Sequence, residues 1–187
     1  GRTCGCGGTA IWENGRLHFA NNWVRHRFLQ NGPEIVEFEA EYAPWRVGSR
    51  LVSERRRIAL KLGSNFNRIE CHYQIEPPGE LTVAVGIVER PGDGRVLRNR
   101  EEGWLSYWEP ESPPNGSIAC ALWVPPERIV DILRAEGHYL VLARVSPDRP
   151  LIYAAGAGWS KGDFPTPELW EAHVREFSRS ARKELKP

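Results

Sequence analysis

The chain has 187 residues, of which 41% are hydrophobic and 26% charged, and its formal net charge is +1. This composition is typical of one globular domain with a single core. The balanced charge excludes general binding to nucleic acids or membrane surfaces, which needs a basic excess, and no apolar run approaches the roughly 18 residues of a membrane-spanning helix. The sequence contains no Met, so we expect a processed or trimmed product.

The first half of the chain alternates between apolar and polar residues, with turn signals at short intervals, which is typical of antiparallel β-structure. A hairpin is predicted over residues 11–18, because Asn14 and Gly15 favour a two-residue turn. Residues 81–88 are almost wholly apolar, which predicts a central strand buried on both faces. The other strands predicted here are 23–30, 35–42, 51–62 and 66–75.

The second half continues the strand pattern and adds two predicted helices. Residues 127–135 follow Pro125 and Pro126 and suit a short helix. The last helix begins at Pro167, with Thr166 as its N-cap. Four apolar residues spaced along one stripe indicate that this helix packs on a sheet; they are Trp170, Val174, Phe177 and Ala181. The further strands predicted are 104–108, 118–124, 138–145 and 151–155. The sequence therefore predicts an all-β protein, an antiparallel β-sandwich with one C-terminal α-helix packed on it.

Four cysteines are too few and too scattered for a disulfide scaffold. Cys71 and Cys120 lie in apolar strand-like runs and are expected to be buried thiols. Cys4 and Cys6 form a Cys-x-Cys pair, but a zinc site needs more ligands, and the nearest histidine is His18. No phosphate-binding, dinucleotide-binding or nucleophile-elbow motif occurs. We expect no metal and no cofactor.

Charged side chains gather on one face of the four strands predicted between residues 23 and 75. If these strands pair as a meander, alternate side chains of neighbouring strands lie about 4.5–5.5 Å apart. One interpretation is a solvated face with weak ion pairs. The other is a surface that binds an acidic sugar, where guanidinium groups clamp carboxylates and His72 transfers a proton. The residues are Arg25, Arg27, Glu37, Glu39, Glu41, Arg55, Arg57, Arg68, Glu70, His72 and Gln74.

Two further clusters could contact a sugar. Trp104 and Trp108 share one face of a predicted strand and are followed by Glu109, which could form a stacking platform with a carboxylate; the alternative is that both indoles belong to the core. Trp159, Lys161 and Asp163 follow a glycine-rich strand end. Lys161 could neutralise a carboxylate and Asp163 could act as an acid or base, or the segment is a surface loop with an Asp–Lys pair.

Six segments spread along the chain carry a resemblance to known proteins: GCGGTAIWENGRL, NGPEIVEFEAEYAPW, GSNFNR, GWLSYWEPE, HYLVLA and YAAGAGWSKGDF. Together they resemble one bacterial family, the domain of unknown function 4861. The resemblance covers nearly the whole chain and implies that residues 1–187 form one β-sandwich domain, the C-terminal portion of a longer, supersandwich-like architecture. It also implies a secreted or periplasmic protein encoded near enzymes that degrade pectin and other polysaccharides.

These observations predict a carbohydrate-active protein that cleaves a uronic-acid-containing, pectin-like glycan by lyase or glycoside hydrolase chemistry. The candidate catalytic residues are Arg68, Glu70 and His72. The candidate substrate-binding residues are Arg25, Arg27, Arg55, Trp104, Trp108, Glu109, Trp159, Lys161 and Asp163. Two alternatives stay open. One is a non-catalytic carbohydrate-binding module, and the other is a structural half-domain whose sheet is completed by a partner chain or by a second copy.

Overall fold

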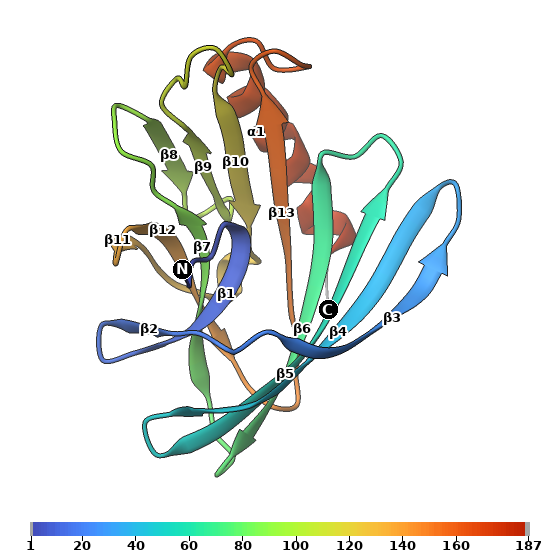
Figure 1. Cartoon of the computed structure of the whole chain (residues 1–187), viewed down its shortest axis with the longest axis vertical. Helices are drawn as coiled ribbons and strands as arrows, with labels where there is room; N and C mark the ends of the chain where they lie inside the picture. The colour runs from blue at the N-terminus through green and yellow to red at the C-terminus, as the bar shows by residue number, and fades with distance from the viewer. Residues whose placement is uncertain (1, 186–187) are drawn as a thin grey trace.

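The computed structural model describes residues 2–185 as two antiparallel β-sheets and a C-terminal helix (Figure 1). The small sheet has the order β11-β12-β7-β1-β2, and the large sheet has the order β3-β4-β5-β6-β13-β10-β9-β8. The predicted antiparallel sandwich is therefore confirmed. The strands are β1 (Cys6–Glu13), β2 (Arg16–His18), β3 (Trp23–Asn31), β4 (Ile35–Val47), β5 (Arg50–Lys61), β6 (Phe66–Glu76), β7 (Leu81–Val88), β8 (Arg95–Asn99), β9 (Trp104–Trp108), β10 (Ile118–Trp123), β11 (Ile129–Ala135), β12 (His138–Val145) and β13 (Leu151–Trp159).

The facing surfaces of the two sheets bury a continuous hydrophobic core. β7 lies at the centre of the small sheet, between β12 and β1, and is buried along most of its length, as its apolar sequence predicted. In the large sheet, every second residue of β6 enters this core, and the residues between them face outwards. The core residues of β6 are Ile69, Cys71, Tyr73 and Ile75. The polar residues of the same strand thus reach the outer surface.

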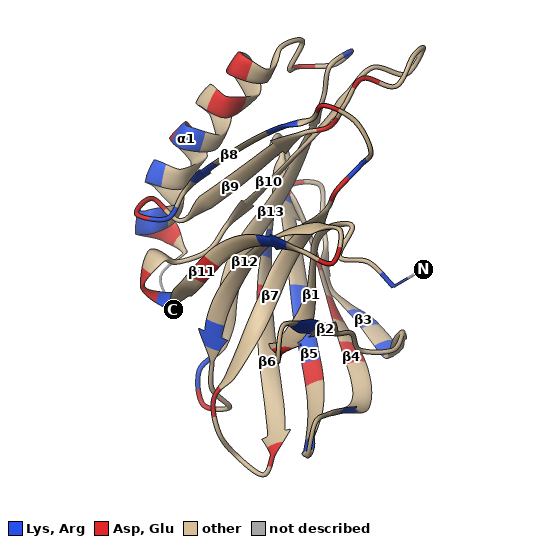
Figure 2. Ribbon diagram, turned by 90° about the vertical axis from the view of Figure 1, so that its left-hand side faces the viewer, with Lys and Arg blue, Asp and Glu red and all other residues tan. Residues whose placement is uncertain are grey.

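Helix α1 (Pro167–Glu184) covers the outer face of the large sheet over β9 and β10. Its predicted start is confirmed, because Thr166 accepts a hydrogen bond from the amide of Leu169 at 3.4 Å. Acidic residues lie near its beginning and basic residues near its end (Figure 2), which suits the helix dipole. A second hydrophobic core forms beneath it, and its main members are Phe66, Trp104, Trp123, Phe164, Trp170, Val174 and Ala181.

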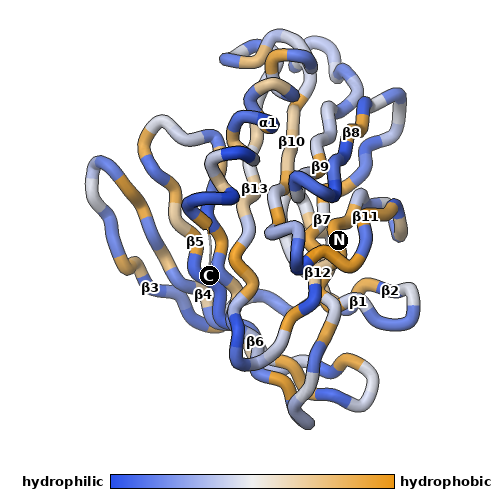
Figure 3. Tube along the Cα trace, turned by 180° about the vertical axis from the view of Figure 1, so that it is seen from behind, coloured by the Kyte–Doolittle hydropathy of each residue, from blue (hydrophilic) through white to orange (hydrophobic). Residues whose placement is uncertain are grey.

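Hydropathy follows this layered arrangement. Both hydrophilic and hydrophobic residues occur along β3, and hydrophilic residues are frequent along α1 (Figure 3). In the part of the chain that the structure describes, no helix is both long and apolar enough to cross a lipid bilayer.

The short helix predicted over residues 127–135 is wrong. Only a 3-10 turn, η1 (Pro126–Arg128), follows the two prolines, and strand β11 then pairs with β12. The residues after the turn are rich in β-branched side chains, which favour a strand when a partner strand is available. Glu136 and Gly137 both have positive φ and form the tight turn of the β11–β12 hairpin.

We expect Trp170→Ala to lower the free energy of unfolding by about 3–5 kcal/mol, because this indole is fully buried between α1 and the large sheet. Leu169→Ala is the matched control, since its side chain lies on the exposed face of the same helix, and it should change stability by no more than about 0.5 kcal/mol. Urea unfolding measures both. Equal losses would show that α1 does not depend on this contact.

Candidate functional site

The outer face of β3–β6 carries the charged residues that the sequence singled out. Strand register places them in two rows of alternating charge, which confirms the predicted meander. The first row is Arg27, Glu39, Arg57 and Glu70, and the second is Arg25, Glu41, Arg55 and His72. We call these two rows, with Arg68 beside them, the charged face.

Glu39 is the most deeply buried member of the charged face, with 1% of its side chain exposed. Its carboxylate accepts hydrogen bonds from Arg27 at 3.0 Å and from Arg57 at 2.9 Å, and Nε of Arg55 lies 3.6 Å away. Burial alone would raise the pKa of this carboxyl, but the hydrogen bonds from Arg57 and Arg27 outweigh burial and lower it. Two residues expected to bind substrate, Arg27 and Arg55, therefore surround one carboxylate.

The three candidate catalytic residues lie side by side on β6. Glu70 accepts a hydrogen bond from Arg68 at 2.9 Å, and Nε2 of His72 lies 2.7 Å from its other oxygen. Burial would raise the pKa of Glu70, but its hydrogen bonds to His72 and Arg68 lower it. Glu70 thus holds His72 in place and stays ionised, as a carboxylate that orients a general base does.

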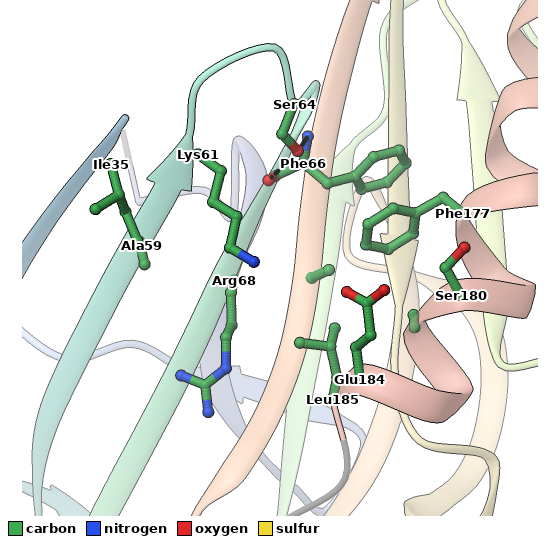
Figure 4. Close-up of a pocket in the computed structure, with 12 residues that line it drawn as sticks. Ile35, Ala59, Lys61, Ser64, Phe66, Arg68, Phe177, Ser180, Glu184 and Leu185 are labelled. Atoms are coloured by element: carbon green, nitrogen blue, oxygen red, sulfur yellow. Dashed lines mark hydrogen bonds between the residues drawn. The ribbon is translucent and has the colours of Figure 1, made fainter. Parts of the chain in front are cut away.

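Two hollows flank the charged face. His72 and its cross-strand neighbour Arg55 line one of about 530 Å³. A narrower groove of about 160 Å³ lies between the sheet and the end of α1 (Figure 4). Lys61 and Arg68 line its sheet side, and Phe177 lies on its helix side. The chain from Arg68 through Glu70 to His72 connects the two hollows.

Trp104 and Trp108 do not form the expected stacking platform. Trp104 is buried under α1, where its Nε1 donates to Glu102 at 2.7 Å and the guanidinium of Arg175 covers its ring. Trp108 packs against the same core and is only partly exposed. Both indoles belong to a core, as the alternative interpretation predicted, because the helix covers the strand face that they share.

Glu109 lies apart from those two indoles, at the end of the sandwich where it contacts Arg90 at 3.4 Å. Trp159 is half-exposed there, and both residues line a hollow of about 490 Å³. Nε1 of Trp159 donates a hydrogen bond to the carbonyl of Asn115, and Nζ of Lys161 donates one to the carbonyl of Pro114. Both side chains therefore hold the neighbouring loop.

Asp163 is exposed in the turn before α1 and forms no ion pair with Lys161 among residues 2–185. The structure brings neither Lys161 nor Asp163 to the charged face. The Asp–Lys pair of the alternative interpretation is not formed either, because the amine of Lys161 reaches across to the loop instead.

A polar cluster on the inner face of the large sheet was missed by the sequence analysis. Arg56 donates to Glu54 at 2.7 Å and to Thr9 of the small sheet, and its guanidinium lies 5.1 Å from the centre of the Tyr42 ring. Burial raises the pKa of Tyr73, whose hydroxyl has no hydrogen-bond partner within residues 2–185. We call these five residues the polar seam. Strand alternation could have found it, since Glu54 and Arg56 must face opposite to Arg55 and Arg57.

Cys71 and Cys120 are buried, as predicted. The amide of Cys4 donates to Nε2 of His138 at 3.1 Å, and burial raises the pKa of its thiol to about 12. Cys6 is the one cysteine that is exposed as a residue among residues 2–185. Its thiol donates to the carbonyl of Gly156 at 3.4 Å, and a hydrogen bond with the Cys120 side chain lowers its pKa. Within the described residues, no three His, Cys, Asp or Glu side chains gather as metal ligands.

By its fold, the protein is an antiparallel β-sandwich with one helix packed on the outside and a charged outer face. The chain belongs to the family of the domain of unknown function DUF4861, whose model matches residues 1–186. It is similar to uncharacterized protein P7 of Formosa agariphila, with 26% identity over 195 residues. The match covers 99% of this chain and 47% of that protein, so the chain spans about half the length of this curated relative.

We expect Glu39→Gln to destabilise the protein by about 1–3 kcal/mol at neutral pH, because three arginines lose their shared charge. The folded pKa of Glu39 lies below its ordinary value of 4.5, so its contribution is complete above that value and is lost as the pH falls through the folded pKa. The free energy of unfolding of the Glu39→Gln variant should therefore fall less on acidification than that of the parent protein. Glu37→Gln, a variant of the next outward residue of β4, should follow the parent protein in chemical unfolding between neutral and acidic pH.

A short pulse of iodoacetamide on the native protein should modify one thiol, that of Cys6. Cys6 is an exposed residue whose thiol has a lowered pKa, whereas the other three cysteines are buried. Mass spectrometry should find one adduct in the parent protein and in Cys4→Ser, and none in Cys6→Ser. Several adducts on the folded protein would contradict the assigned burial.

Proposed function

We propose that the protein is a carbohydrate-active enzyme that acts on uronic-acid-containing glycans at the charged face, with lyase chemistry. One observation carries this proposal. His72, held by Glu70 at 2.7 Å, and Arg55, its cross-strand neighbour, line the same hollow of about 530 Å³. A base beside a guanidinium is what removal of a proton next to a carboxylate requires.

In the proposed reaction, Arg55 binds the carboxylate of a uronic acid and stabilises the charge that develops when the neighbouring proton leaves. His72 takes that proton, and the electron pair forms a carbon–carbon double bond. The glycosidic bond on the adjacent carbon breaks, and the leaving oxygen takes a proton from water in the open hollow. Arg68 and Glu70 act as positioning residues, because Glu70 contacts His72 and Arg68 contacts Glu70, while neither of them lines the hollow.

Hydrolase chemistry is less well supported by the same surface. A glycoside hydrolase needs one carboxyl group that stays protonated as the general acid, and such groups have raised pKa values. Glu39 and Glu70 are both surrounded by hydrogen-bond donors that lower their pKa. A polymeric substrate would also be met outside the cytoplasm, so secretion or a periplasmic location is part of the proposal.

The test is to incubate the protein with polygalacturonate and with neutral glucan, and to follow the ultraviolet absorbance of unsaturated products. We expect product from the acidic polymer alone. His72→Ala should slow its formation by about 10²- to 10⁴-fold, and Arg55→Ala should reduce it strongly. Arg144→Ala, a variant of an exposed arginine in the small sheet, is the matched control and should keep full activity. Reducing ends without unsaturated product would point to hydrolysis and overturn the lyase assignment.

A binding module is the second candidate, and the half-exposed Trp159 supports it. Its ring lines the hollow that Arg90 and Glu109 also line, and an indole face suits the apolar face of a sugar ring. If this is the function, Trp159→Ala should weaken binding of oligosaccharides in calorimetry, and no product of either kind should form. His72→Ala would then leave binding unchanged.

A further inference from the structure

The edge of the large sheet formed by β3, β4 and β5 has an apolar inner face that the small sheet does not cover. The most extensive contacts between the two sheets run from β1 and β7 to β10 and β13. The end of β4 and the start of β5 still reach the main core through Trp45, Val47 and Val52, whereas β3 and the parts of β4 and β5 beside it extend away (Figure 1). We call the exposed apolar surface of these three strands the inner wing face. Its residues are Trp23, His26, Phe28, Val36, Phe38 and Leu60, and it borders Ile58, which packs against the main core.

The exposure of this surface is unusual for a β-sandwich. Phe28 is 63% exposed and Trp23 is 52% exposed, whereas Glu39 on the opposite face of the same strands is 1% exposed. A sheet normally buries its apolar face and leaves its polar face in water. A contiguous apolar patch of this kind marks an interaction surface.

The side chains themselves favour protein over sugar as the occupant. Sugar-binding platforms present open ring faces, but Trp23 and His26 meet edge to face at 4.7 Å, as do His26 and Phe28 at 6.5 Å. Branched aliphatic residues from β4 and β5 fill the rest of the surface. This mixture of aromatic and aliphatic side chains resembles the surface with which one sheet packs against another in a β-sandwich.

The outer edge of β3 determines a second property of the occupant, namely its backbone pairing and its charge. In the strand order of residues 2–185, β3 pairs only with β4, so the hydrogen-bonding groups along its other edge are available. On the outer side of this edge, Arg25 is 75% exposed and Arg27 is 60% exposed. Arg25 approaches a carboxylate no closer than 3.9 Å, at Glu41. A strand laid along β3 would therefore meet positive charge on one side and apolar surface on the other.

A second copy of the chain does not satisfy this requirement. β3 itself carries no carboxylate, so a second β3 could not pair with Arg25 and Arg27 in any register. An antiparallel pairing centred on His26 would place Arg25 opposite Arg27, and like charges directly opposite each other are destabilising in a sheet. Carboxylates on the incoming strand would instead continue the alternation of charge that already crosses β3–β6. The curated relative is about twice as long as this chain and so has room for such a strand.

We infer that β3 is a docking edge for a strand of another polypeptide segment, one that carries carboxylates on the side of Arg25 and Arg27 and apolar side chains on the side of Trp23 and Phe28. The strand extends the large sheet, and its apolar residues cover the inner wing face. The inference shares only Arg25 and Arg27 with the charged face. Neither residue takes part in the proposed reaction, so the inference does not depend on the proposed enzymatic function.

The probe is a capped peptide about ten residues long in which Ile and Glu alternate, compared with the same peptide carrying Lys in place of Glu. Hydrogen exchange of the full chain, read by mass spectrometry, reports on the amides of β3. The Ile/Glu peptide should slow exchange in residues 23–31 and bind at least about tenfold more tightly than the Ile/Lys peptide, given two favourable charge pairs against two unfavourable ones.

Variants separate the two requirements. Phe28→Asp should abolish the protection, and Leu169→Asp, at an equally exposed apolar position on α1, should leave it intact. Arg25→Glu should remove the preference for the Ile/Glu peptide or reverse it, without loss of fold, because the side chain is exposed.

Three results would overturn the inference. The first is protection of β3 by neither peptide. The second is a dimer in sedimentation whose formation itself protects β3, which would assign the edge to a second copy. The third is protection of residues 23–31 by oligosaccharides, which would make the inner wing face a sugar platform.

Discussion

The arrangement of the two sheets depends on the place where β1 crosses β13. Gly7 has a φ of +90°, and a Cβ at this position would collide with the Cβ of Ala155, so only glycine fits there. The carbonyl of the same residue accepts a buried hydrogen bond from the hydroxyl of Tyr153 at 2.6 Å. This close approach holds the small sheet over β13 and β10, towards one side of the large sheet.

That off-centre position explains why the large sheet has three environments. Over β10 and β13, one face contacts the small sheet and the other contacts α1, so their residues are buried on both sides. Next to this region, the polar seam forms where Thr9 of β1 reaches Arg56 and Glu54 of β5. Beyond the seam, β3 and the first part of β4 have neither layer above them, although Trp45 and Val47 at the other end of β4 belong to the main core. The inner wing face is exposed for this reason, although its residue pattern is that of a core-facing strand.

Much of the fold could be predicted because period-two alternation is a local property. The outward set of β6, from Arg68 to Gln74, and the charge rows across β3–β6 follow from alternation and hairpin pairing alone. The helix start at Thr166 is equally local. The β11 strand was missed because Glu136-Gly137 is a weaker hairpin signal than Asn14-Gly15, and proline before a short segment suggested a helix.

The parts that could not be predicted depend on contacts between distant segments. Whether Trp104 stacks on a ligand or on protein is decided by α1, which begins some sixty residues later and closes over that strand. The burial of Glu39 needs arginines from both neighbouring strands. The approach at Gly7 requires the register of β1 against β13, which no local pattern of residues specifies.

The abundance of arginine on the charged face also limits the chemistry available there. Arg27, Arg55 and Arg57 around Glu39, and Arg68 and His72 around Glu70, keep both carboxylates ionised. Such carboxylates can orient a base or order a set of cations, but they do not donate protons near neutral pH. Each guanidinium has five N–H donors, and the bonds to Glu39 occupy only some of them. These features are the reason why we propose proton removal by His72, beside guanidinium groups that can still bind an anion, for this surface.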